Sequence, residues 1–75
     1  MTVYDSIAAA MVAGGATRTE MCAMRERFGD AADLALKQCN ELDRKSPEYA
    51  QAHDRFMLAC EMCAAVARFI SAAKV

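Results

Sequence analysis

A chain of 75 residues with 56% hydrophobic residues, 25% charged residues and a net charge of −1 has the composition of one small globular domain. A domain of this size buries only about 60% of the surface of its unfolded chain, so we expect one hydrophobic core and no large catalytic cleft. Nine basic residues balance ten acidic ones and are spread from Arg18 to Lys74. This even spread gives no basic patch of the kind that binds nucleic acid or an anionic membrane.

The residue types favour helices throughout. The chain is rich in alanine, contains six methionines and no tryptophan, and has a single proline, Pro47. No run of about 18 uncharged apolar residues is present, and the apolar segment Ile7–Ala13 follows Asp5 rather than a basic region. We therefore expect an all-α, cytoplasmic protein without a transmembrane helix or secretory signal, in which the four cysteines stay reduced.

The first helix is short. Thr2 precedes Asp5 by three residues, so the threonine can accept a backbone hydrogen bond while the carboxylate lies in the positive first turn. Gly14 and Gly15 together favour a helix end, because glycine readily adopts a positive φ. This pattern predicts a helix at about residues 3–13.

The second helix follows at once. Thr17 and Glu20 have the spacing of a capping box, which predicts a helix at about residues 18–43. Gly29 lies inside this helix and permits a bend or close packing there. Apolar residues that recur every three or four positions form one face: Met21, Met24, Phe28, Ala32, Ala35, Cys39 and Leu42.

A tight reversal comes next. Ser46 is placed as an N-cap, Pro47 as the first helical residue and Glu48 in the first turn, which predicts a third helix at about residues 47–73. Its apolar seam repeats at steps of three and four: Tyr49, Ala52, Phe56, Ala59, Cys63, Val66 and Ile70. Two long helices joined by so short a connection predict an antiparallel helical hairpin, with the short N-terminal helix added, as a single domain over residues 1–75.

A second apolar stripe runs along the third helix beside this seam, through Leu58, Met62, Ala65 and Phe69. A hairpin covers only one stripe on each helix, so something else must cover this one. The short helix, through Ile7, Met11 and Val12, is one candidate. A partner protein is the other, since large exposed apolar patches usually mark interfaces.

The sequence offers little catalytic or metal-binding chemistry. Cys60 and Cys63 are three residues apart and could form a metal or redox site with Cys22 and Cys39. However, both lie within an apolar helical pattern, where cysteine commonly acts as a small hydrophobic residue. His53 has no nucleophile and orienting carboxylate arranged around it. We therefore expect no enzyme activity, no cofactor and no metal site.

The stretch from Leu42 to Tyr49 resembles the turn and second helix of a known family, together with a set of residues that follows it: Phe56, Ala59, Val66, Phe69 and Ile70. This family comprises the small E-component co-chaperones of type III secretion needle proteins, which are cytoplasmic helical hairpins with a proline-led turn. The resemblance implies a protein that binds a tetratricopeptide-like chaperone and helps it hold the needle subunit unpolymerised before export.

The leading hypothesis is thus a co-chaperone that lays apolar helix faces against a larger helical partner. A structural homodimer, with two hairpins in a four-helix bundle, is the alternative, and a thiol-based metal or redox protein is a third. The expected partner-binding residues are Tyr49, Phe56, Leu58, Met62, Phe69 and Ile70.

Overall fold

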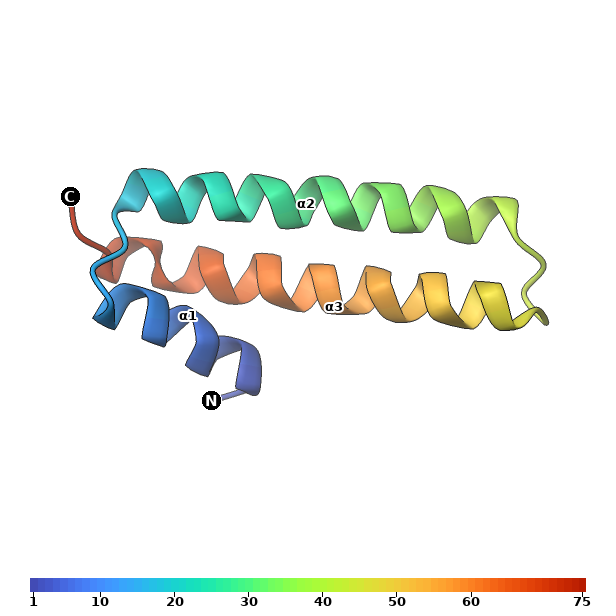
Figure 1. Cartoon of the computed structure of the whole chain (residues 1–75), viewed down its shortest axis with the longest axis horizontal. Helices are drawn as coiled ribbons and strands as arrows, with labels where there is room; N and C mark the ends of the chain where they lie inside the picture. Colours follow the sequence, from blue (N-terminus) through green and yellow to red (C-terminus); the bar gives the residue numbers. More distant parts are fainter.

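The computed structural model describes residues 1–75 and is all-helical, as the composition predicts (Figure 1). Its three α-helices are α1 (Val3–Ala13), α2 (Arg18–Glu41) and α3 (Pro47–Phe69), and a short 3₁₀ turn, η1 (Ile70–Ala72), follows α3. No β-strand is present, and the only β-type pairing is an isolated bridge between Thr17 and Lys74.

Each of the first two helices starts at a capping box, which was predicted for α2, whereas for α1 only the Thr2 cap was predicted. In α1 the Thr2 hydroxyl accepts a hydrogen bond from the Asp5 N–H at 3.1 Å, and the Asp5 carboxylate accepts one from the Thr2 N–H at 3.2 Å. Thr17 and Glu20 form the same reciprocal pair at the start of α2, with both distances 3.1 Å. These contacts satisfy backbone donors that a helix start otherwise leaves free.

The start of α3 also agrees with the sequence. The Ser46 hydroxyl caps the helix by accepting a hydrogen bond from the Tyr49 N–H at 3.2 Å, and Pro47 occupies the first turn. Proline fits this position because the first turn has no partner for its missing N–H.

The last two helices end earlier than predicted. α2 stops at Glu41 because the polar turn makes its own hydrogen bonds: the Asp43 side chain accepts from the Lys45 N–H at 3.0 Å, and the Asp43 carbonyl accepts from the Ser46 hydroxyl at 2.7 Å. Such local hydrogen bonds compete with helix continuation.

α3 stops at Phe69 for a different reason, because the chain beyond it pairs with the connection between α1 and α2. The Lys74 N–H donates to the Ala16 carbonyl at 3.1 Å, and the Arg18 N–H donates to the Lys74 carbonyl at 2.7 Å. A helix continued to residue 73 would carry Lys74 away from both partners.

The helices form a long, thin molecule of 44 × 21 × 14 Å. α2 and α3 lie side by side along their lengths and run in opposite directions, and α1 lies against only the C-terminal part of α3 (Figure 1). The end near the 42–46 turn therefore has two helices, whereas the other end has three.

The buried residues differ between these two ends. Near the turn, the buried seam of the α2–α3 pair consists of small side chains: Ala32, Ala35, Cys39, Ala52 and Ala59. The three-helix end holds the main cluster, which includes the only large side chains that are fully buried, Met21 and Val66; the whole cluster is Ala8, Met21, Met62, Ala65, Val66 and Ala73. Most of the apolar volume of the core thus lies where α1 packs.

The two glycines Gly15 and Gly29 should respond oppositely to alanine. Gly29 lies within α2, and a methyl group there would have no atom within 4 Å, so Gly29→Ala should raise the free energy of unfolding by about 1 kcal/mol. Gly15 has a φ of +93°, so Gly15→Ala should lower that free energy by about 1 kcal/mol. Urea unfolding measures both values, and a destabilised Gly29→Ala variant would show that α2 needs a glycine there.

Candidate interaction surface

An open apolar groove lies between α2 and α3 on the two-helix side of the core. It encloses about 330 Å³, and its walls carry Leu34, 58% exposed, and Leu58, 53% exposed. We call this surface the leucine groove; its lining residues are Phe28, Ala31, Leu34, Ala35, Gln38, Arg55, Leu58 and Ala59. In this groove, large apolar side chains from two helices lie near each other and are exposed to solvent.

The helical repeat explains why both leucines reach the same face. Leu34 comes one residue before the buried Ala35, and Leu58 comes one residue before the buried Ala59. One residue rotates a side chain by about 100° around the helix. Because α2 and α3 run in opposite directions, the same offset on both helices brings both side chains to the same face of the pair.

The groove continues into the surface that α1 covers. Leu58 lies on the same line of α3 as Met62, Ala65 and Phe69, and Phe28 lines the groove while also packing against the main core cluster. α1 lies against only the C-terminal part of α3 (Figure 1). One apolar surface is therefore closed at one end by α1 and open at the other.

α1 covers part of the second stripe, which is one of the two possibilities that the sequence left open. Met62 is only 7% exposed and belongs to the core cluster, and Phe69 is half-buried against that cluster. α1 closes this part of the stripe through Ala8, which is fully buried, and through further residues packed on the cluster: Tyr4, Met11 and Val12. Ile7, one of the residues expected to cover the stripe, instead points outward and is 44% exposed.

The remaining expected partner-binding residues are all half-buried. Tyr49 stacks on His53 with ring centroids 6.1 Å apart, and Ile70 packs against the core cluster from η1. Phe56 is half-buried as well. Among the six expected anchors, only Leu58 is exposed. Leu34 was not expected to bind a partner. Its position one residue before Ala35, on the α2 stripe, is the sequence signal that could have identified it.

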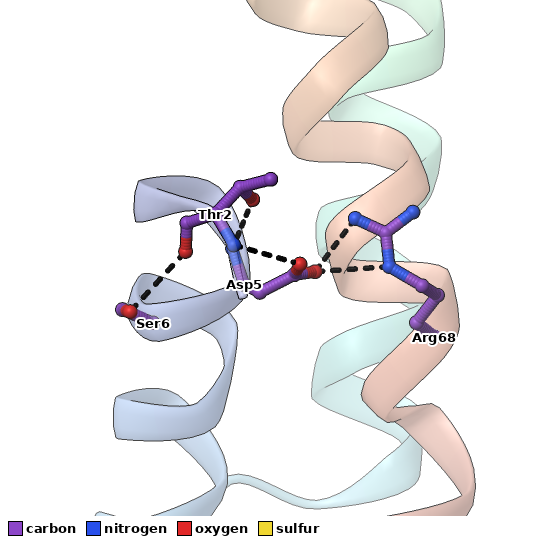
Figure 2. Close-up of polar contacts among 4 residues, drawn as sticks. All are labelled: Thr2, Asp5, Ser6 and Arg68. Carbon is purple, nitrogen blue, oxygen red and sulfur yellow. Dashed lines mark hydrogen bonds and ion pairs between the residues drawn. The ribbon is translucent and has the colours of Figure 1, made fainter.

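One ion pair fixes α1 to α3. In Figure 2 the Asp5 side chain extends from α1 toward Arg68 on α3, and Asp5 Oδ1 accepts hydrogen bonds from Arg68 Nη2 at 2.6 Å and Nε at 2.9 Å. The Arg68 guanidinium, helped by the Thr2 backbone N–H, holds the pKa of Asp5 below its ordinary value. Asp5 therefore both caps α1 and anchors that helix to α3.

The arginine of the leucine groove has no such partner. Arg55 lines the groove beside Leu58 and forms no ion pair, since Asp5–Arg68 is the only salt bridge in the chain. Toward the turn, Arg55 also lines a second hollow of about 310 Å³ with Glu41 and Glu48. The apolar floor of the groove thus has an unpaired cation at its edge and two carboxylates beyond it.

The four cysteines are free thiols. Cys39 is buried and the others are half-buried, and the Cys63 thiol donates a hydrogen bond of 3.6 Å to the Arg25 carbonyl. No group of three or more histidine, cysteine, aspartate or glutamate side chains is placed to hold a metal ion. His53 is exposed on α3.

Comparisons with protein-family models, with curated proteins and with solved structures gave no match to this chain. None of its helices is long and apolar enough to cross a membrane.

The Asp5–Arg68 pair predicts a pH-dependent contribution to stability. Because the pKa of Asp5 is lowered in the folded protein, the pair stabilises fully above the ordinary aspartate pKa of about 4 and is lost as the pH falls through the lowered value. Asp5→Asn should therefore lower the melting temperature more at pH 7 than at pH 2. Asp30→Asn, on the exposed side of α2, is the control. An equal loss at both pH values would contradict the role of the carboxylate charge.

Leu58 and Met62 lie on the same stripe but should respond differently to a charge. Leu58→Asp should change the free energy of unfolding by less than about 0.5 kcal/mol, because Leu58 is exposed. Met62→Asp should lower it by several kcal/mol, because the carboxylate would enter the core without a partner. Circular dichroism during urea unfolding measures both. Unfolding of the isolated chain by Leu58→Asp would mean that Leu58 is covered.

Proposed function

We propose that this chain is a non-enzymatic cytoplasmic co-chaperone, built on an antiparallel helical hairpin, that binds a larger helical, tetratricopeptide-like chaperone. Through that chaperone it helps keep a type III secretion needle subunit unpolymerised before export. The observation that carries the proposal is the pair of leucines, Leu34 and Leu58, each more than half exposed across one groove. Apolar patches of this kind usually mark interfaces in small proteins.

Two further features support this function. The turn from Leu42 to Tyr49 resembles that of the E-component family, whose turn is led by a proline, and Pro47 lies in the first turn of α3. Tetratricopeptide-like repeats stack helix pairs into extended concave binding surfaces. A thin protein of 44 × 21 × 14 Å with an apolar face suits such a surface.

The proposal predicts that neighbouring genes encode a tetratricopeptide-like chaperone and a needle subunit, and coexpression of the chain with both gene products tests it. The three proteins should copurify, and the needle subunit should stay monomeric in light scattering. Leu58→Asp should weaken chaperone binding at least 10-fold, which corresponds to about 1.4 kcal/mol. The matched control is Met57→Asp, because Met57 is 45% exposed on α3 but does not line the groove.

Two results would contradict the proposal. Unchanged chaperone binding by Leu58→Asp would exclude the leucine groove as the binding face. A stable dimer of the isolated chain that Leu58→Asp converts to a monomer would instead support the structural homodimer.

A further inference from the structure

The packing of α1 provides an example of what fits the uncovered part of the same surface. α1 presents Tyr4, Ala8 and Met11 to the core cluster, at steps of four and three residues. This spacing places the three side chains on one face of a helix. Its edge is fixed by one carboxylate, Asp5, bound to an arginine of α3. A short amphipathic helix with an acidic edge is thus the element that this surface binds within its own chain.

The leucine groove resembles the surface under α1, with an apolar floor and an arginine at its edge, but no helix covers it. Leu58 continues the line that α1 covers, and Phe28 contributes to both the core cluster and the groove, so the floor is continuous. Arg55 stands at the edge of the groove with no carboxylate in the chain bound to it. The open half therefore lacks two features that α1 provides in the closed half, an apolar helix face and a carboxylate bound to the nearby arginine.

The part of the molecule that α1 leaves free limits the length of a helix that could bind in the groove. α1 has 11 residues and is about 16 Å long, which leaves roughly 27 Å of the 44 Å molecule. A helix of at most about 18 residues fills that length.

The area argues against a second copy of the chain as the occupant. The open face is roughly 27 Å long and narrower than the 21 Å width of the molecule, because that width includes α1, so it offers less than roughly 600 Å². A standard stable interface buries about 800 Å² on each partner. One helix lying in a groove is a common mode of recognition that does not need the larger area.

We propose that the leucine groove binds a single amphipathic helix of the partner protein, of at most about 18 residues, end to end with α1. This helix places apolar side chains between Leu34 and Leu58 and a carboxylate on Arg55. The inference rests on the proposed function, because it names the element through which the larger helical partner binds. It adds the requirement that the bound helix carries a carboxylate for Arg55, which an apolar contact alone would not need.

A displayed peptide library tests the inference on the full chain. The library consists of 18-residue helices with leucine or alanine fixed at every third and fourth position, and with glutamate, glutamine or lysine varied at the positions flanking that face. Selection against the wild-type chain should enrich glutamate at one flanking position. The selected peptide, made synthetically, should bind at least 10-fold more weakly to Leu58→Asp and bind Met57→Asp unchanged.

A charge exchange distinguishes specific recognition from nonspecific apolar binding. Arg55→Glu should weaken the selected glutamate peptide at least 5-fold, and replacing that glutamate by lysine should restore binding to the Arg55→Glu chain only. Circular dichroism of each variant checks that the fold is kept.

Three results would overturn the inference: no enrichment over the Leu58→Asp chain, enrichment without glutamate, or self-association of the chain through the groove. The chaperone copurification stands apart from this test. If the chaperone binds through Leu58 but Arg55→Glu has no effect in either experiment, the proposed function holds and the acidic helix is wrong.

Discussion

The packing of α1 on α3 is the contact on which both the stability and the open surface of this protein depend. Two helices alone bury one seam each, and near the turn that seam consists of alanines and Cys39. Small side chains let helices approach closely but remove little apolar surface from water. The two large, fully buried side chains, Met21 and Val66, both lie in the cluster that α1 completes with Ala8. Without α1, the protein would lose the only part of its core that is enclosed by three helices.

The short length of α1 also determines where the leucine groove begins. α1 covers the apolar stripe of α3 around Met62 and leaves Leu58 open, so one end of this surface belongs to the core and the other is exposed. The position of α1 is itself secured at both ends. The Asp5–Arg68 ion pair fixes its start, and the pairing of Lys74 with the connection between α1 and α2 fixes the chain beyond its end. The boundary between core and groove is therefore set by polar contacts as well as by apolar packing.

Local signals in the sequence predicted the helix starts well, because Thr2, Thr17 and Ser46 each bind a backbone group only three residues away. The C-terminal end of α3 could not be predicted in this way, since the pairing of Lys74 joins segments far apart in the chain. The same limit applies to the candidate site. Periodicity identified the second stripe and Leu58, but which part α1 covers depends on contacts such as Asp5–Arg68, across 63 positions.

Methyl NMR of the isolated chain with a soluble paramagnetic gadolinium chelate measures whether α1 closes one half of a continuous apolar surface and leaves the other half open to solvent. The methyl groups of Leu34 and Leu58 should relax strongly, whereas those of Met21 and Met62 should be protected. If the Met62 methyl relaxes as strongly as those of Leu58, α1 does not cover the stripe and the account is wrong. Protected leucine methyl groups at low protein concentration would contradict it equally, because the groove would then be closed within the chain.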